Sequence, residues 1–432
     1  MTNMLRSTPW PQGRAVFISF SLVCAMSVPE NSFGQQDTTR ILFIGNSYVN
    51  SNDLPGMVQQ LSTSMGEVVE TMRVSPGGTT FEWHSTSAVT QAAIAQGGWD
   101  FVVLQEQSQR PSFPPALVAV DVYPYAASLV AQVHAVDPCT DVVFLMTWGR
   151  ENGDQANCEF YEPLCTYEGM QQRLRDSYVE MAIDNTSWCA PVGVVWAQHR
   201  EEHPTTGLYT DGSHPNVTGS YIAACTLAST MFRRSCAEAT WSPSELTIDQ
   251  ASYIRSLSSA IVLDSMSTWN IGVSDPDVQF TWNMVGTGMV LFANNTTGSV
   301  EQTWDFGDGS TSDEVDPTHA YTTPGTYSVS LSVVDACGRT ASRTEEINIS
   351  TTGINEVQQH RPEVRLRSRS VSISGVPKHA RITIMDNLGR FLLDTNVPAS
   401  GLVELTNEQN GLLLWRITTT TGQHFDGKLY AQ

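Results

Sequence analysis

The first large part of the chain alternates apolar runs with stretches of helical period. Four apolar runs are short and continuous, which is typical of strands buried on both faces of a sheet; they lie at 41–44, 101–104, 142–146 and 192–196. Helical stretches lie between and after them, at 54–65, 117–135, 168–183 and 246–266. This alternation predicts a three-layer α/β domain over residues 37–272, with a mostly parallel sheet between two layers of helices. The active site of such a domain belongs at the carboxyl ends of its strands.

From about residue 275 the pattern changes to short strands with a period of two. Residues 326–333, with the sequence TYSVSLSV, show it clearly, and Gly, Asp and Asn turns separate the strands. A linker at 350–354 divides this region. We therefore expect two all-β sandwich domains, at 275–350 and 355–432, after the α/β domain. A length of 432 residues agrees with two to three domains.

The N-terminus has the pattern of a secretory signal peptide over residues 1–34. Arg6 and Arg14 precede an apolar stretch at 15–27, and residues 32–34 offer small side chains for a cleavage site. The apolar stretch is too short for a comfortable membrane span. The sequence therefore predicts a protein that is secreted or attached to the cell surface.

The chain is strongly acidic, with a formal net charge of −21. Removal of residues 1–34 takes away two arginines and one glutamate, so the mature charge becomes −22. Phosphates of nucleic acids and anionic membranes would repel such a chain. We expect neither as a partner, and we expect a monomer.

Seven cysteines remain after Cys24 is removed with the signal peptide. Six of them lie between residues 139 and 236, which predicts up to three disulfides in an exported protein and leaves Cys337 as a free thiol. We expect Cys158–Cys165 to bond across a short loop, and Cys225–Cys236 as a second pair. Zinc binding is the alternative, but the sequence has neither a Cys-x-x-Cys nor a paired-histidine spacing, so we expect no metal and no cofactor.

A candidate nucleophile follows the first apolar run. Gly45 and Asn46 break the predicted strand, and Ser47 stands before the next helical stretch. A serine on a strand-to-helix turn is well placed to attack a carbonyl, and nearby backbone N–H groups can bind the resulting oxyanion. The same residues also occur in ordinary loops.

A candidate base lies far downstream, in the sequence DGSHPN at 211–216. Asp211 and His214 are three residues apart before a helical pattern, so the carboxylate can reach one imidazole nitrogen while the other faces Ser47. The alternative is that Asp211 only caps the turn and that His214 is a surface residue.

Four motifs occur in the order of the SGNH (GDSL-type) hydrolase blocks. They are Gly45-Asn46-Ser47, Gly77-Gly78-Thr79-Thr80, the polar strand end LQEQSQ at 104–109 and DGSHPN at 211–216. Residues 37–240 therefore resemble that superfamily. The resemblance implies that Ser47 is the nucleophile, His214 the base and Asp211 its partner. It also implies that the backbone N–H groups of Ser47 and Gly77 bind the oxyanion.

The chain departs from the family pattern at two places. Asn46 replaces the usual aspartate, a change that we expect to have little consequence. The third block lacks its usual Gly-x-Asn-Asp, so the side-chain oxyanion donor is open. A glutamine amide can donate the same bond from a longer arm, which makes Gln107 or Gln109 the candidate, with Gln105 behind them. These glutamines could instead simply end the strand.

Other polar and aromatic residues have weaker signals. Trp148, Arg150 and Asn152 follow the third apolar run and are expected on the rim of the site. Glu106 is expected as an exposed rim charge, with an acid or base role as the alternative. His84 is expected to be a surface or packing residue.

The two C-terminal regions each resemble a known module. Residues 275–350 contain WDFGDG at 304–309, HAY at 319–321 and PGTY at 324–327, which resemble a PKD-type domain. Residues 355–432 contain ITIMDNLGR at 382–390 and GLLLWRI at 411–417, which resemble the C-terminal sorting domain of type IX secretion. The resemblance implies the type IX machinery as a partner; an immunoglobulin-like adhesion module is the alternative.

Together these features predict a secreted serine esterase that removes small acyl groups, acetyl above all, from carbohydrates. A small-molecule or polysaccharide ester would be the substrate. One alternative is a surface glycan-binding protein on an inactive hydrolase fold. Another is a lipase or thioesterase of the same superfamily, although no apolar lid segment is visible.

Overall fold

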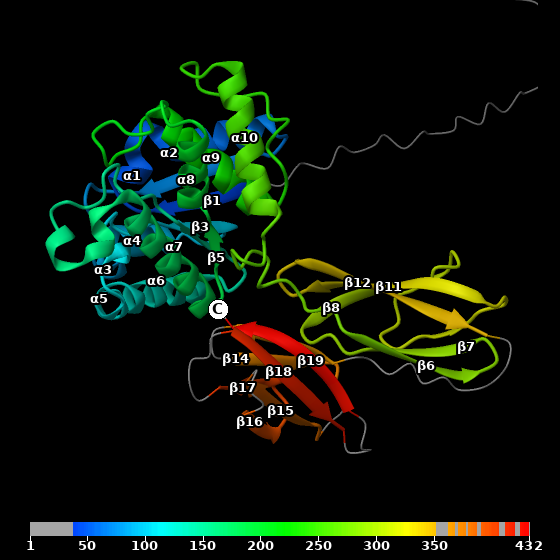
Figure 1. Ribbon diagram of the computed structural model, residues 1–432. Coiled ribbons are helices and arrows are strands. Elements are labelled where there is room, and N and C mark those ends of the chain that lie inside the picture. Colours follow the sequence, from blue (N-terminus) through cyan, green and yellow to red (C-terminus); the bar gives the residue numbers. More distant parts are fainter. Residues whose placement is uncertain are drawn as a thin grey trace, which may run out of the picture. The chain divides into compact units, whose positions relative to one another are not determined.

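The computed structural model describes residues 38–350, 362–367, 370–376, 379–386, 390–405, 411–419 and 424–431 (Figure 1). The signal peptide expected at 1–34, Cys24 and most of the linker expected at 350–354 lie outside these residues.

The α/β domain contains a parallel sheet of five strands in the order β2-β1-β3-β4-β5. The strands are β1 (Thr39–Ile44), β2 (Val69–Val74), β3 (Phe101–Leu104), β4 (Asp141–Leu145) and β5 (Trp188–Ala190). Residues 41–44 of β1 are fully buried, as expected for a strand covered on both faces. The parallel α/β architecture is thus confirmed.

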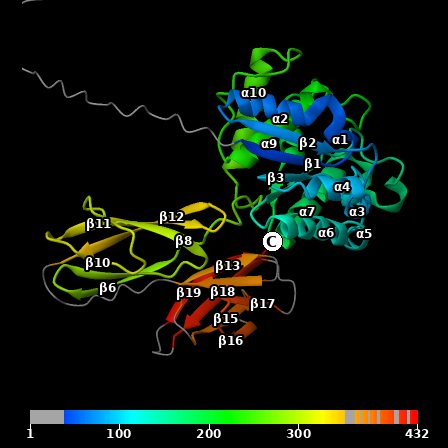
Figure 2. The same cartoon turned by 180° about the vertical axis from the view of Figure 1, so that it is seen from behind.

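Helices cover both faces of the sheet, which Figures 1 and 2 show from opposite sides. They are α1 (Ser47–Asn50), α2 (Leu54–Ser64), α3 (Phe81–Thr86), α4 (Ala88–Ile94), α5 (Pro115–Asp121), α6 (Tyr123–Val136), α7 (Tyr167–Asp184), α8 (Val192–Glu202), α9 (Val217–Phe232) and α10 (Ile248–Leu263). Four 3-10 turns join them: η1 (Ser51–Asp53), η2 (Arg110–Ser112), η3 (Cys158–Phe160) and η4 (Glu162–Cys165). Helices α2, α9 and α10 pack together on one face, and α4, α6 and α7 lie on the other.

The strand expected at 192–196 is wrong, because these residues begin helix α8. The strand of this region is β5, which ends just before Pro191. Within α8 the buried residues Val192, Val195, Trp196 and His199 repeat at helical spacing. A short apolar run does not distinguish a buried strand from one face of a helix, so the period was visible only over a longer window.

The helix expected at 117–135 is divided into α5 and α6 at Val122. Pro124 lies in the first turn of α6, where a missing N–H costs nothing, whereas inside a continuous helix it would break the backbone ladder. By length and composition the whole stretch Pro115–Val136 could cross a membrane. In this fold α6 buries Ala126, Leu129, Val130 and Val133 in the core of the α/β domain.

Two all-β domains follow, as expected. The first has the sheets β10-β7-β6 and β12-β11-β8-β9, and the second has β13-β14-β17 and β16-β15-β18-β19. The strands of the first are β6 (Phe280–Gly286), β7 (Met289–Asn294), β8 (Ser299–Asp305), β9 (Thr311–Ser312), β10 (Thr318–Ala320), β11 (Gly325–Asp335) and β12 (Thr340–Ile349). Those of the second are β13 (Glu363–Arg367), β14 (Ser370–Ser374), β15 (Arg381–Asp386), β16 (Phe391–Asn396), β17 (Leu402–Glu404), β18 (Gly411–Thr418) and β19 (His424–Ala431). In the first domain Trp304, Phe306 and Tyr321, from the WDFGDG and HAY motifs, are buried in the core.

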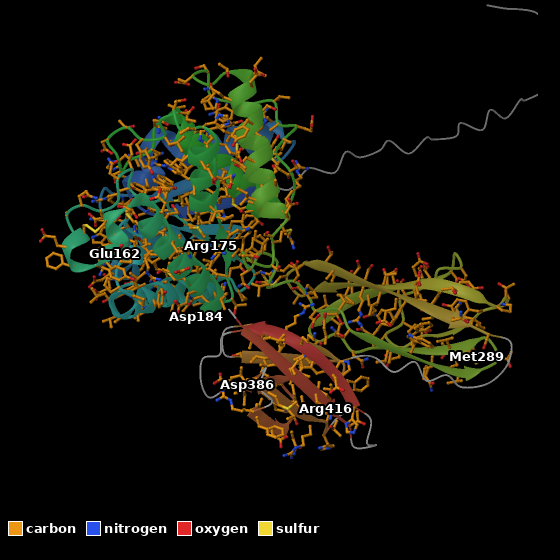
Figure 3. The ribbon with its side chains drawn as sticks, in the orientation of Figure 1. Glu162, Arg175, Asp184, Met289, Asp386 and Arg416 are labelled. Atoms are coloured by element: carbon orange, nitrogen blue, oxygen red, sulfur yellow. A yellow bond between two sulfur atoms is a disulfide. The ribbon has the colours of Figure 1, made fainter. Side chains whose placement is uncertain are left out.

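The disulfides were predicted only in part. Cys158–Cys165 forms, with its Cα atoms 4.6 Å apart, in the loop marked by Glu162 in Figure 3. Cys225–Cys236 is wrong, since both are buried free thiols, as is Cys189. The free state expected for Cys337 is also wrong, because it bonds to Cys139 across 198 residues, with a Cα separation of 5.2 Å. Sequence proximity favoured pairs within one domain, whereas Cys139 finds its partner in the next.

Candidate active site

Ser47 lies at the carboxyl end of β1, on the tight turn that leads into α1. Gly45 is required at this turn, because a Cβ atom there would lie 2.6 Å from Val49 Cγ2 and 2.7 Å from Gln105 Oε1. Both distances are shorter than carbon contacts allow. The strand therefore ends where only glycine fits, and the next two residues turn the serine toward the edge of the sheet.

Asn46 holds this turn through three hydrogen bonds. Its Oδ1 accepts from the Tyr48 N–H at 3.1 Å, its Nδ2 donates to Thr79 O at 3.1 Å, and its own N–H donates to Gln105 Oε1 at 3.0 Å. An aspartate could accept the first bond but could not donate the second. The amide of Asn46 thus ties the nucleophile turn to the loop before α3, a link that the usual aspartate could not make.

The structure brings Ser47, His214 and Asp211 together in one line. Ser47 Oγ lies 2.9 Å from His214 Nε2, and His214 Nδ1 lies 2.7 Å from Asp211 Oδ2. With its Nδ1–H donated to Asp211, the neutral imidazole presents a lone pair on Nε2 to the serine hydroxyl. This is the geometry of a nucleophile, a base and an orienting carboxylate.

Asp211 also caps its own turn, so both interpretations of the Asp-x-x-His motif hold. Its Oδ1 accepts from the backbone N–H of His214 at 2.7 Å and of Ser213 at 3.0 Å. The bonds from the backbone and side chain of His214 lower the pKa of Asp211 to about 2. The carboxylate therefore stays ionised at neutral pH and can stabilise an imidazolium.

Buried aromatic rings support the loop that carries His214. Tyr48 stacks on Trp148 at 4.8 Å between ring centroids, and Trp148 stacks on Trp196 at 4.1 Å. Tyr48 Oη lies 2.7 Å from Ser213 Oγ, and Trp148 Nε1 donates to Ser213 O at 3.1 Å. Trp148 is only 1 % exposed, so it supports the loop from below and is not on the rim as expected. These bonds restrict His214 through its neighbour.

The loop expected to bind the oxyanion lies beside the nucleophile turn. Thr79 Oγ1 donates to Gly45 O at 3.0 Å, and its carbonyl takes the Asn46 amide. Among the described residues, the backbone N–H groups of Ser47 and Gly77 have no hydrogen-bond partner. A side chain on Gly77 would meet no atom within 4 Å, so this turn borders open space. Both groups are thus free to donate.

The side-chain amides of the three glutamines after β3 make different hydrogen bonds. Gln105 is fully buried, and both ends of its amide are bonded inside the protein, with Oε1 accepting the Asn46 N–H and Nε2 donating to Glu106 O. Gln107 Nε2 donates to Gln109 Oε1 at 3.1 Å. Gln109 Nε2 donates to the buried carboxylate of Asp154 at 2.8 Å. Each of these two amides keeps a second hydrogen for another acceptor.

The sequence did not show that His84 and Glu106 are buried beside the nucleophile turn. His84 is fully buried, and its Nε2 lies 2.8 Å from Gly45 O while its Nδ1 lies 2.8 Å from Thr90 Oγ1. Burial lowers the pKa of His84, which keeps the ring neutral. Glu106 is also fully buried, so the exposed rim charge expected there is wrong. Neither residue has a local sequence signal, since their partners come from other elements.

The described part of the chain contains no group of three or more His, Cys, Asp or Glu side chains placed to hold a metal ion. The reactive groups found at this edge of the sheet are the serine, the histidine and the carboxylates.

The α/β domain is similar to two solved structures. One is a DUF4886 family protein from Bacteroides uniformis, at 18% identity and a TM-score of 0.46, covering 53% of this chain and 96% of that one. Another is a provisionally assigned SGNH hydrolase from Slackia heliotrinireducens, at 29% identity and a TM-score of 0.37, covering 45% of this chain and 100% of that one.

The first all-β domain has its own relatives. A microbial collagenase from Vibrio alginolyticus is 46% identical over 76 residues, which make up 17% of this chain and 9% of the collagenase. The chain spans about a tenth of the length of the curated relatives it matches. The family model of the PKD domain matches residues 288–350, so a PKD domain is present there.

Proposed function

We propose that this protein is a serine esterase. The observation that carries the proposal is the line from Ser47 Oγ through His214 to Asp211, with distances of 2.9 and 2.7 Å. A hydroxyl, an imidazole and an ionised carboxylate in this order form the arrangement that activates serine toward carbonyl carbon. The free N–H groups of Ser47 and Gly77 beside it supply donors for an oxyanion.

In the proposed reaction Ser47 Oγ attacks the ester carbonyl while His214 Nε2 takes its proton. Asp211 holds the imidazole and stabilises its positive charge. The tetrahedral oxyanion accepts bonds from the N–H groups of Ser47 and Gly77 and from a glutamine amide. His214 then gives its proton to the leaving alcohol, and water activated by the same histidine releases the acid from Ser47.

Between the two glutamines we favour Gln107 as the side-chain donor. The amide of Gln109 already bonds the buried, charged Asp154, which fixes its direction. The amide of Gln107 bonds only another neutral amide, and its Oε1 is held by the N–H groups of Gln109 and Arg110. The second hydrogen of the Gln107 amide is therefore free to bind an oxyanion, and no bond to a charged group holds the amide elsewhere.

A small acyl group on a carbohydrate is the substrate class that we propose, and acetyl is the foremost candidate. The side chains of His214 and Asp211 are 39% and 53% exposed, so the triad opens broadly to solvent. An open site admits a bulky sugar polymer as the alcohol part of an ester. A lipase or thioesterase would instead have to shield a long acyl chain from water.

Hydrolysis of a chromogenic acetyl ester by the purified protein tests the proposal. We expect turnover that disappears in Ser47→Ala, faster hydrolysis of acetyl than of octanoyl esters, and release of acetate from acetylated polysaccharides. A folded wild-type protein that hydrolyses no ester but binds the same polysaccharide would replace the esterase with the glycan-binding alternative. Preference for octanoyl esters would favour the lipase alternative.

We further propose that the protein is exported as a monomer and that residues 355–432 address it to the type IX secretion machinery. The support is the sequence resemblance of this region and two disulfides, which form and persist in oxidising compartments. Deletion of 355–432 in the native host should retain the protein inside the cell. Unchanged surface delivery would leave the adhesion-module alternative.

A further inference from the structure

Glu106 joins the two loops that flank the nucleophile. Its carboxylate accepts the Phe81 N–H at 3.0 Å through Oε2 and the Gln107 N–H at 2.5 Å through Oε1. Phe81 begins α3, directly after the Gly77–Thr80 loop, and Gln107 belongs to the loop after β3. One carboxylate thus fixes the backbone on both sides from which oxyanion donors are proposed to come.

The neighbouring Gln105 makes the matching connection to the nucleophile itself. Its Oε1 accepts the Asn46 N–H, so consecutive residues after β3 hold the nucleophile turn and the two flanking loops. The backbone N–H of Glu106 is held in turn by the Tyr178 hydroxyl of α7 at 3.2 Å. This bond anchors the arrangement to α7.

Glu106 is fully buried, and the described residues form no ion pair with it. Burial of a carboxylate without a cationic partner opposes folding. A neutral side chain of similar shape would fill the same space without this cost. We therefore look for a role of the charge other than stability. The two hydrogen bonds that the carboxylate accepts, from the Phe81 and Gln107 N–H groups, indicate that it holds these two loops.

We propose that ionised Glu106 is a positioning residue that holds the Gly77–Thr80 loop and the Gln107 loop in the arrangement that binds the oxyanion, and that its protonation loosens this arrangement. The inference rests on the proposed function. A protonated carboxyl turns one oxygen into a hydroxyl, which is a poorer acceptor, so one of the two N–H bonds weakens.

The electrostatic surroundings place this change near neutral pH. Burial raises the pKa of Glu106 to about 7, against the lowering effect of the Gln107 and Phe81 N–H groups. Arg110 of η2 also lowers the pKa of Glu106, and Glu82 of α3 raises it. From α7, Tyr178 contributes a hydroxyl that stays protonated, because burial raises its pKa.

The Glu106→Gln variant separates this role from a structural one. We expect kcat for an acetyl ester to fall on the order of 10-fold, below the 10²–10³ typical of losing an oxyanion donor outright, with little change in KM. The acid limb of log kcat/KM against pH should be steeper in the wild type than in Glu106→Gln, because Glu106 must be deprotonated in the wild type and is absent from the variant.

Thermal stability should change in the opposite sense to activity. A carboxyl whose pKa is raised in the folded state binds its proton more tightly there, so the wild type loses stability as pH rises from the ordinary glutamate value, about 4.5, to about 7. The Tm of Glu106→Gln relative to the wild type should therefore increase between pH 5 and pH 8, while its relative activity decreases. A merely structural residue would lose both together.

Glu82→Gln is the matched control, because it removes a nearby carboxylate of α3 that is 54% exposed. It should keep kcat and the steep acid limb of the wild type, and shift that limb slightly toward lower pH because Glu82 raises the pKa of Glu106. A Glu106→Gln protein with unchanged kcat and an acid limb as steep as that of the wild type would overturn the proposal.

A measurement on the wild type covers the case in which Glu106→Gln does not fold. Carbon-13 NMR of glutamate carboxyls should show one group titrating at about pH 7. The absence of any glutamate titrating in that range overturns the proposal. Failure of the proposed function is distinct: the wild type would then hydrolyse no ester, whereas Ser47-dependent turnover without the Glu106 effects sinks only this inference.

Discussion

Single side chains decide the chemistry at this site through the partners that the fold gives them. Asp211 has an ordinary carboxyl whose pKa falls to about 2 because His214 donates to it from both backbone and side chain. Burial instead raises the pKa of the Glu106 carboxyl to about 7. The same functional group is thus kept charged in one place and made titratable in the other.

The Asp211→Asn variant should keep the fold and lose most of its activity. An amide can still accept from the loop N–H groups, but it no longer enforces the tautomer with the Nε2 lone pair facing Ser47. We expect kcat to fall by up to about 10⁴-fold, and Ser47→Ala or His214→Ala to cost at least as much. Steady-state kinetics and circular dichroism would measure this; nearly full activity in Asp211→Asn would contradict the triad.

Asp211 should not contribute to the acid limb of the wild-type activity profile. Since its pKa in the folded protein is lowered to about 2, the stability it contributes is present above the ordinary aspartate pKa and is lost only as pH falls through the lowered value. Between about pH 5 and 7 the carboxyl of the site that becomes protonated is therefore Glu106 and not Asp211.

The Asn46→Asp variant tests whether the amide at this turn matters. A carboxylate would face Thr79 O, an acceptor, with no hydrogen to donate. We expect a loss of about 1–3 kcal/mol in the free energy of unfolding and a lower kcat. Asn50→Asp, at an exposed position of α1, is the control and should change neither. Equal stability of the two variants in chemical denaturation would show that the Thr79 bond is dispensable.

At the scale of elements, close packing between helices determines where the His214 loop lies. Helix α9 follows this loop directly, and its first turn packs against Trp196 of α8, the last ring of the stack under Ser213. Asn216 caps α9 by accepting from the Gly219 N–H at 3.0 Å. The helix start, the ring stack and the base are therefore coupled by contact.

The Gly219→Ala variant should be destabilised, although alanine is the better helix former by about 0.5–1 kcal/mol. Its Cβ would overlap the Trp196 ring and lie 2.7 Å from Leu208 O. Overpacking of this kind costs about 1–3 kcal/mol and should lower kcat by displacing the stack. Gly207→Ala, where a Cβ meets no atom within 4 Å, is the control. A higher Tm for Gly219→Ala would show that the rings yield easily.

At the scale of the whole molecule, the residues of the proposed site all come from the α/β domain. The two all-β domains contain separate cores, built around Trp304 in one and Trp415 in the other. Besides the polypeptide chain, the disulfide Cys139–Cys337 joins the PKD domain to the α/β domain. The β domains thus supply no residue of the proposed site, and the disulfide links the PKD domain to the domain that does.

Deletion of residues 275–432 should leave turnover of a small soluble ester nearly unchanged. Cys139 loses its partner in this truncation, so Cys139→Ser should accompany it to avoid an unnatural free thiol. Loss of turnover in the folded truncation would mean that the β domains complete the site. The full-length Cys139→Ser/Cys337→Ser protein is the matched control for the missing bond.

Cleavage of the full chain between the α/β and PKD domains tests the disulfide directly. The fragments should migrate together in non-reducing electrophoresis and separate after reduction. Unfolded, unreduced protein should also show the three free thiols of Cys189, Cys225 and Cys236 within the described part of the chain. Fragments that separate without reductant would return Cys337 to the free state first expected from the sequence.

The sequence by itself determined what depends on near neighbours. The apolar run before Gly45, the Asp-x-x-His spacing and the loop between Cys158 and Cys165 are local patterns, and the strand end, the carboxylate–imidazole bond and the disulfide follow from them. The change of period near residue 275 likewise predicted the all-β domains.

Only the tertiary structure decided what depends on residues far apart in the chain. The burial of Glu106 requires α3 and α7, the role of Asn46 requires Thr79, and Cys337 requires a partner 198 residues away. The run at 192–196 lies in helix α8, and the strand that pairs with β4 is the preceding β5. Apolar patterns specify that a segment is buried, but its partners are fixed only when the layers pack, and those partners set the hydrogen bonds and pKa values of the site.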